Sequence, residues 1–239
     1  MQFYKNFIGY KTEELFQEFS GSDTKEAFEE SLITQPEDWY YRTNSVNYVR
    51  NSYGHRCKEL ADLDLNNYIL YVGCSYTEGI GLELEKTYPY LVSNDLDTDY
   101  YNLGLGATGV DIMSYNLIQW NNLVKTEPKA LVIQWPSVAR YSAINKNNTD
   151  TLSLIGPWDS RQTVTTFLTI GGMPVVSYFL SKKLILQRLI RTLFTCPVIE
   201  FEIDEFAGKL IDRGRDSHPG IKSNRYIADT VKKRILDEI

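Results

Sequence analysis

Short apolar runs alternate with amphipathic stretches from residue 67 onward. Four runs rich in β-branched and aromatic residues predict strands: 67–73, 99–104, 130–135 and 196–203. Four stretches with apolar residues at helical spacing predict helices: 87–96, 110–125, 181–194 and 227–239. Strands that alternate with helices favour a parallel sheet covered on both faces. We therefore expect a three-layer α/β/α fold with a mostly parallel, flavodoxin-like sheet.

Residues 1–66 are more polar and follow no such alternation. They contain two helix-like pieces, EELFQEF (13–19) and KEAFEESL (25–32). We expect 1–66 to be an N-terminal extension packed on a main α/β domain at 67–239.

One uncharged segment, Gln162–Ser181, is long enough to be a membrane-span candidate. It contains Gly171, Gly172, Pro174 and many hydroxyl groups, which favour a buried or pocket-lining segment instead. The neighbouring basic stretch SKKLILQRLIR suits a membrane surface or, as we expect, packing on the sheet with its cations in water.

Composition narrows the class of protein. The 239 residues carry a net charge of −6, which disfavours binding to nucleic acid. Three cysteines are too few for a disulfide framework, and the N-terminus lacks a secretory pattern, so we expect a cytoplasmic protein. The chain has two histidines and no Cys/His cluster at ligand spacing, so no metal is expected.

Two short motifs carry candidate chemistry. Gly73-Cys74-Ser75-Tyr76-Thr77-Glu78-Gly79 follows the first strand of the predicted sheet, where a small nucleophile between glycines is exposed at the strand's carboxyl end. Arg215-Asp216-Ser217-His218-Pro219-Gly220 places an acid and one of the two histidines before the last helix. A serine needs a base, and the base needs an orienting group, so the two motifs together suggest nucleophilic catalysis.

The combination resembles the SGNH hydrolases, the superfamily of GDSL-type esterases and lipases. YVGCSYTEG is similar to their first block, YNLGLGATGVD (101–111) to their second, and RDSHPG to their last. NSYGHR (51–56) is similar to the lead-in of members with an N-terminal extension, so we interpret His55 as structural. The resemblance covers roughly residues 68–239.

The resemblance implies a role for each matching residue. Ser75 would be the nucleophile, His218 the general base and Asp216 its orienting acid. The backbone N–H of Ser75 would be one oxyanion donor, and that of Gly106 or Ala107 the second. It implies an esterase or deacylase acting on a small-molecule or carbohydrate acyl ester, with O-acetyl groups first, and no cofactor.

The chain departs from the family pattern at four points. Cys74 replaces the usual Asp, and Ala107 stands where a Gly is expected. Asp216 precedes His218 by two residues instead of three. The third block, with its oxyanion-donating Asn, is absent, and IQWPSVAR (133–140) offers only Gln134 or Ser137 as substitutes.

Other interpretations remain open. Gly104, Gly106 and Gly109 form a G-x-G-x-x-G pattern typical of nucleotide binding, although the next strand ends without the acid that would bind a ribose. Cys74 is a second candidate nucleophile, but its acidic surroundings favour a buried core thiol. Five aromatic residues are candidates either for a sugar-binding cleft or for the core: Tyr76, Tyr88, Tyr90, Trp135 and Trp158. A binding or structural protein on the same scaffold is the alternative to an enzyme. The oligomeric state is not set by the sequence.

Overall fold

Four parallel strands form the central sheet. The computed structural model describes residues 1–4, 7–136, 140–145, 148–156 and 175–239. The strands are β5 (Tyr68–Val72), β6 (Asp99–Asn102), β7 (Ala130–Trp135) and β10 (Val198–Glu202). Their order in the sheet is β10-β7-β5-β6, all parallel. This is the flavodoxin-like order, whose ligand-binding crevice lies where the order reverses, at the carboxyl ends of β5 and β7.

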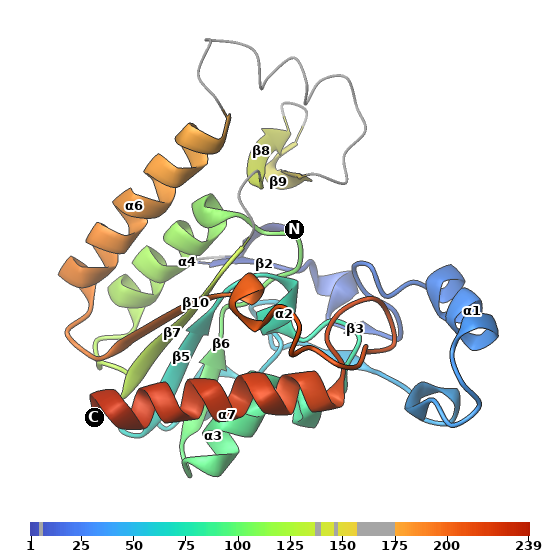
Figure 1. Ribbon diagram of the computed structural model, residues 1–239. Helices are drawn as coiled ribbons and strands as arrows, with labels where there is room; N and C mark the ends of the chain where they lie inside the picture. The colour runs from blue at the N-terminus through green and yellow to red at the C-terminus, as the bar shows by residue number, and fades with distance from the viewer. Residues whose placement is uncertain (5–6, 137–139, 146–147, 157–174) are drawn as a thin grey trace.

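Helices cover both faces of this sheet. Helices α3 (Tyr88–Asp95) and α7 (Ile221–Glu238) lie side by side on one face. Helices α4 (Val110–Leu123) and α6 (Val175–Leu193) lie on the other (Figure 1). The predicted three-layer α/β/α fold is therefore confirmed. Each predicted helix and strand of this part is present, although α6 and α7 each begin six residues earlier than expected.

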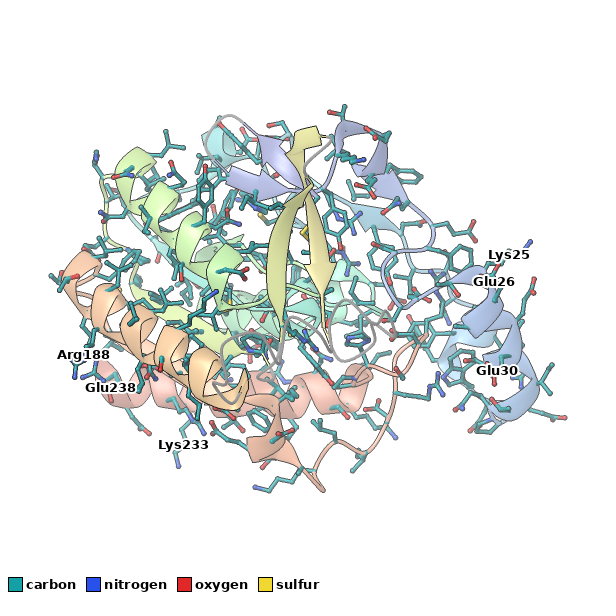
Figure 2. All side chains as sticks on the ribbon, turned by 90° about the horizontal axis from the view of Figure 1, so that it is seen from above. Lys25, Glu26, Glu30, Arg188, Lys233 and Glu238 are labelled. Carbon is teal, nitrogen blue, oxygen red and sulfur yellow. The ribbon has the colours of Figure 1, made fainter. Side chains whose placement is uncertain are left out.

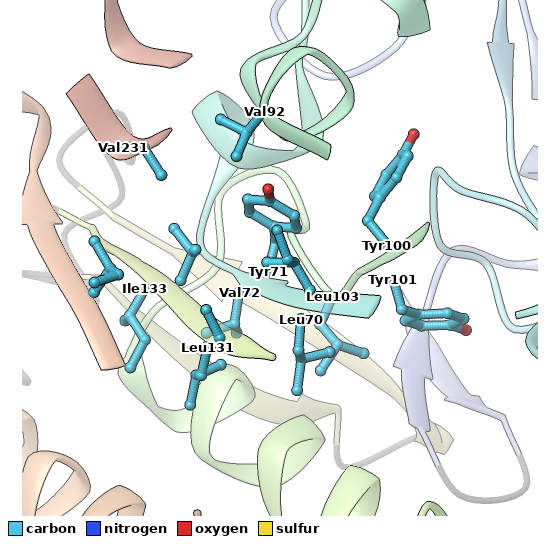
Figure 3. Packing of buried hydrophobic residues seen from close by; sticks show 14 of the residues in the cluster. Leu70, Tyr71, Val72, Val92, Tyr100, Tyr101, Leu103, Leu131, Ile133 and Val231 are labelled. Atoms are coloured by element: carbon cyan, nitrogen blue, oxygen red, sulfur yellow. The ribbon is translucent and has the colours of Figure 1, made fainter. Parts of the chain in front are cut away.

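The core lies between these layers, and its side chains alternate across the sheet. Tyr71 points toward Val92 of α3, whereas Leu70 and Leu131 point to the opposite face, toward α4 (Figure 3). All residues of β5 and β7 are buried, because a parallel strand with helices on both faces has no side in contact with water.

The first 66 residues contain short elements. They are β1 (Gln2–Tyr4), β2 (Phe7–Gly9), β3 (Phe16–Gln17), α1 (Lys25–Thr34), β4 (Tyr48–Val49) and three 3₁₀ turns at Thr12–Glu14, Tyr40–Arg42 and Leu60–Asp62. Phe7 is buried in the same core cluster as residues of β5, β6 and β7. Helix α1 lies at the periphery, and Lys25, Glu26 and Glu30 point outward from it (Figure 2).

One helix expected in this segment was wrong. EELFQEF forms the turn Thr12–Glu14 and strand β3 instead of a helix. The cause is distant pairing: Phe16 and Gln17 pair with Val49 and Tyr48, and Leu15 accepts a hydrogen bond from the Arg50 backbone N–H at 2.8 Å. Tertiary contacts thus override a helical local pattern.

Two elements follow β7 that the sequence pattern did not indicate. The antiparallel strands β8 (Tyr141–Asn145) and β9 (Asn148–Ile155) extend the β1–β2 hairpin into a second sheet of order β2-β1-β9-β8. The turn Leu84–Lys86 and the turn Ile203–Phe206 complete the described elements. Most of the uncharged segment Gln162–Ser181 lies outside the described residues. Within the described part of the chain, no helix combines the length and the apolarity that a membrane crossing needs.

Candidate active site

Ser75 stands at the first position of α2 (Ser75–Glu78), directly beyond the carboxyl end of β5. The turn is tight, because a Cβ at Gly73 would lie 2.1 Å from Thr77 Oγ1. Gly79 ends α2 in the left-handed region, at φ 79°, which glycine adopts without strain. The preceding residue, Cys74, is held by a hydrogen bond that its backbone N–H donates to Gln134 Oε1 at 3.1 Å. Close packing around the turn therefore fixes the position of the serine hydroxyl.

The structure brings Ser75, His218 and Asp216 together. His218 Nε2 lies 2.8 Å from Ser75 Oγ, although the two residues are 143 positions apart. His218 Nδ1 lies 2.7 Å from Asp216 Oδ2, and the His218 backbone N–H donates to Asp216 Oδ1 at 3.0 Å. The two-residue spacing thus allows the same carboxylate to engage both the ring and the backbone of His218.

Asp216 is held in its charged form. Burial raises the pKa of a carboxyl group, but hydrogen bonds from His218 and from the Ser22 hydroxyl outweigh it, so the pKa of Asp216 lies below its ordinary value. An ionised Asp216 requires a proton on His218 Nδ1. His218 Nε2 is then free to accept the proton of Ser75.

Two backbone N–H groups, those of Ser75 and Ala107, are candidates for oxyanion donors. Among the described residues, neither the Ser75 N–H nor the Ala107 N–H has a hydrogen-bond partner, and both residues line the same cavity. The Gly106 N–H, by contrast, donates to Glu78 Oε2 at 2.6 Å. Of the two amides named for the second donor, that of Gly106 is already engaged, whereas that of Ala107 is available.

Ala107 adopts a backbone conformation that is unusual for a residue with a side chain. Its φ is 60°, in the left-handed region where glycine is the usual residue. The methyl group is therefore accommodated at a cost in backbone strain, and the amide keeps the direction that a glycine there would give it.

Gln134 and Ser137 were the two candidates to replace the missing third-block Asn. Gln134 is buried beneath the turn: its Oε1 accepts from Cys74, and its Nε2 donates to its neighbour's carbonyl, Trp135 O, at 2.5 Å. It does not line the cavity at Ser75 within the described residues. Ser137 lies outside the described residues.

Sequence reasoning missed a buried charged network behind the oxyanion loop. Glu78, on the same short helix as Ser75, receives Gly106 N–H and Tyr10 O–H on Oε2, and Arg50 on Oε1 at 2.7 Å. The Arg50–Glu78 pair is fully buried, with side chains 0% and 1% exposed, and the guanidinium lies over the Tyr10 ring at 3.7 Å. Glu78 was visible as an acid within the first block, but only the fold connects it to Arg50.

A cavity of about 680 Å³ opens over Ser75 and His218. Its described lining includes Tyr10, Glu14 and Ser22 from the N-terminal segment, together with Tyr76, Arg140 and Leu154. The lining is thus mixed, with one acidic and one basic side chain beside aromatic and aliphatic groups. The first 66 residues contribute directly to the site.

The other residues that the sequence suggested as a nucleophile or as sugar-binding aromatics lie mostly in the interior. Cys74 is buried, and its thiol lies 3.1 Å from Gln134 Oε1. Tyr88 and Trp135 are buried, Tyr90 packs at the edge of the core, and Trp158 lies outside the described residues. Tyr76 differs, because it lines the cavity with its ring centroid 4.9 Å from that of His218.

Local packing accounts for the outer glycines of the G-x-G-x-x-G pattern. A Cβ at Gly104 would lie 2.8 Å from Asn102 Oδ1 and from the Thr77 side chain. A Cβ at Gly109 would lie 2.4 Å from Arg140 O. No group of three or more His, Cys, Asp or Glu side chains suited to a metal occurs among the residues that the structure describes.

His55 is fully buried and remote from the cavity lining. Its Nδ1 lies 3.1 Å from Tyr101 Oη and its Nε2 3.1 Å from Ile8 O. Burial lowers the pKa of His55 to about 4, so it is neutral at pH 7. These contacts join the N-terminal segment to β6.

Comparisons with known proteins find similarity in structure only. No protein-family model matches the chain, and neither does any curated protein. A carbohydrate esterase family 2 enzyme from Myceliophthora fergusii is similar, with 14% identity and a TM-score of 0.49 over 72% of this chain and 66% of that one. An acetyl xylan esterase from Butyrivibrio proteoclasticus has 12% identity and a TM-score of 0.44 over 72% of this chain and 64% of that one.

A third similar structure belongs to the lipolytic G-D-S-L family of Veillonella parvula. It has 15% identity and a TM-score of 0.39 over 71% of this chain and 96% of that one. These three similar structures are described as esterases and as a lipolytic G-D-S-L protein.

Proposed function

We propose that this protein is a serine ester hydrolase that uses Ser75 as nucleophile, His218 as general base and Asp216 as the group that orients His218. One observation carries the proposal: Ser75 Oγ, both nitrogens of the His218 ring and the Asp216 carboxylate form one hydrogen-bonded chain, with links of 2.8 Å and 2.7 Å, at the wall of a cavity. Such a chain is the arrangement that makes a serine hydroxyl nucleophilic.

The reaction follows from the positions of the protons. Ser75 Oγ attacks the ester carbonyl carbon while its proton passes to His218 Nε2. The carbonyl oxygen gains the negative charge and accepts hydrogen bonds from the N–H groups of Ser75 and Ala107. His218 returns the proton to the leaving alcohol as the bond between carbon and alcohol oxygen breaks. The result is an acyl-Ser75 intermediate.

Water completes the cycle by the same steps in reverse order. His218 takes a proton from water, whose oxygen attacks the acyl carbon, and then returns the proton to Ser75 Oγ as the acid leaves. Asp216 keeps its charge throughout and stabilises the imidazolium. Each oxyanion donor of this kind contributes about 10²–10³-fold in rate, so two backbone donors without an Asn suit a slower enzyme than three donors would.

The mixed polar and aromatic lining supports an alcohol with several polar groups, and the motif resemblance makes O-acetyl groups on carbohydrate the first to test. A panel of p-nitrophenyl acetate, p-nitrophenyl butyrate and acetylated xylan covers small and saccharide esters.

The decisive experiment treats the purified protein with a fluorophosphonate probe and with p-nitrophenyl acetate, beside Ser75→Ala. We expect labelling and turnover in the wild type and neither in the variant. Cys74→Ser serves as the matched control, because it alters the adjacent nucleophile candidate and is expected to keep the label. No label and no turnover in the wild type would overturn the proposal and favour a binding protein on this scaffold.

A further inference from the structure

The acid of the proposed triad has a second hydrogen-bonding partner that comes from the N-terminal segment. Ser22 Oγ donates to Asp216 Oδ2 at 2.7 Å, to the same oxygen that faces His218 Nδ1, and lies 3.4 Å from that nitrogen. Oδ1 is occupied by the His218 backbone N–H. Three donors therefore surround the carboxylate, and Ser22 is the only one of them that lies outside the loop Arg215–Gly220.

The turn that carries Ser22 is fixed in place. Ser20 and Asp23 pair through two backbone hydrogen bonds of 3.0 Å and 3.1 Å, and Gly21 takes a φ of 63° between them. The next residue, Asp23, is bound by Arg215 Nε, 2.9 Å from both carboxylate oxygens, and by the Tyr48 hydroxyl at 2.5 Å. Asp23 and Arg215 are buried, with side chains 0% and 2% exposed.

The two contacts are adjacent and pair the two segments in antiparallel order. Arg215 joins Asp23, and Asp216, the next residue, joins Ser22, so two neighbouring residues of one segment hold two neighbouring residues of the other. The Ser22 contact is thus part of a built junction, and its 194-residue separation means that only the fold brings the hydroxyl there. Among the residues that the structure describes, no other side-chain hydroxyl donates to Asp216.

We propose that Ser22 is a positioning residue of the site: its hydroxyl occupies Oδ2 of Asp216 and holds the carboxylate against His218, so that the imidazole stays aligned on Ser75. The inference rests on the proposed function for its effect on rate. The hydrogen-bond junction itself is testable without any turnover.

The first test is kinetic. For Ser22→Ala, we expect kcat on p-nitrophenyl acetate to fall about tenfold with KM unchanged, because the loss concerns the alignment of groups that act in the transition state. Ser22→Thr keeps a hydroxyl and is expected to restore most of kcat. Ser52→Ala is the matched control: Ser52 Oγ also donates to a carboxylate, Glu59 Oε2 at 2.7 Å, but that pair lines no cavity wall at Ser75.

The second test is spectroscopic. The chain has two histidines, so the ring N–H protons are few, and loss of a signal in His218→Gln assigns the Nδ1–H proton. We expect this resonance to move upfield in Ser22→Ala, because the Asp216 carboxylate is then no longer held against His218 and its hydrogen bond with Nδ1–H becomes longer. It should return toward the wild-type position in Ser22→Thr and stay in place in Ser52→Ala.

The outcomes separate the two proposals. An active wild type whose kcat and Nδ1–H resonance are both unchanged by Ser22→Ala overturns the role of Ser22 alone. A wild type without turnover or label overturns the esterase, and the resonance then still reports whether Ser22 engages Asp216. A Ser22→Thr variant as slow as Ser22→Ala contradicts a hydroxyl-specific role.

Discussion

The two sides of the site are built on different principles. The proposed acid–base side, Ser75 Oγ with His218 and Asp216, is made of side chains from two sequence motifs. The proposed oxyanion side, the N–H groups of Ser75 and Ala107, is made of backbone, and the neighbouring Gly106 N–H is held by Glu78, with Arg50 and Tyr10 behind it. Side-chain groups depend on the residue type at each position, whereas backbone groups depend on the contacts that fix the loop. The backbone side can therefore accept Ala107 in place of a glycine, because either residue supplies an N–H.

The largest effect is expected on the acid–base side, from Asp216→Asn. An amide at this position donates to His218 Nδ1 and thereby leaves the proton on Nε2, which can then no longer accept from Ser75. We expect kcat to fall by about 10³–10⁴-fold at unchanged KM, measured by steady-state hydrolysis of p-nitrophenyl acetate. Asp212→Asn is the control: Asp212 lies on the same segment but accepts from the Lys222 and Ser223 N–H groups at the start of α7. Turnover by Asp216→Asn near the wild-type rate would remove the acid from the mechanism.

The next largest effect is expected from removing Glu78, whose carboxylate accepts the Gly106 N–H. Glu78→Ala leaves Arg50 charged and buried without its partner, and losing one member of a buried pair costs about 3–5 kcal/mol of unfolding free energy. Urea denaturation followed by circular dichroism measures it. Glu205→Ala removes a surface partner of Arg234, with side chains 42% and 37% exposed, and is expected to cost less than about 1 kcal/mol. Equal costs for the two variants would show that the buried network does not support the loop.

A third test uses pH to sharpen the contrast between the two histidines. Burial lowers the pKa of His55 to about 4 in the folded protein, against an ordinary value of 6.5. Below pH 6.5 the unfolded chain gains a proton at His55 that the folded chain does not, so stability is lost as the pH falls from 6.5 to 4, by about 3 kcal/mol in all. His55→Gln should flatten that part of the curve of unfolding free energy against pH. A slope that survives the substitution would assign the loss to other groups.

The smallest effect concerns Ala107. Its φ of 60° places an L-residue in the left-handed region, so Ala107→Gly is expected to raise the unfolding free energy by up to about 1 kcal/mol. The backbone N–H remains, so kcat should stay within about twofold. Ala228→Gly, in the interior of α7, is the opposite control, with a loss of more than about 1 kcal/mol, because the substitution also removes a buried methyl group. A large fall in kcat for Ala107→Gly would mean that the methyl group itself takes part in the site.

The sequence predicted the four strands of the central sheet and the four helices that cover it because their signals are local. Strands β5 and β7 are continuous apolar runs, and α4 has apolar residues at helical spacing, so each pattern survives whatever packs against it. The segment Leu15–Phe19 failed for the opposite reason: its backbone partners lie at 48–50. The pairing of β1 with β9, which joins Gln2 to Thr151, spans far more of the chain and left no local pattern.

The residues of the candidate site also divide into those with a local sequence signal and those without one. Ser75, Asp216 and His218 stand in motifs whose spacing is visible in the sequence, and the fold brings them within hydrogen-bond distance. Ser22, Arg50 and Tyr10 stand in a segment without a motif, and each reaches the site through a contact that spans dozens of residues or more. The sequence left Gly106 and Ala107 as alternatives for the second oxyanion donor. Only the hydrogen bond from the Gly106 N–H to Glu78 distinguishes them.

The junction of Ser22 and Asp23 with Asp216 and Arg215 has a consequence for protein engineering. A truncated version that keeps only the four-stranded sheet and its helices would retain Ser75, Asp216 and His218. It would nevertheless lose Arg50, Tyr10 and Ser22, and expose Glu78 and Arg215 as unpaired charges. The smallest unit that keeps the contacts of Asp216 and Glu78 therefore includes the first 66 residues.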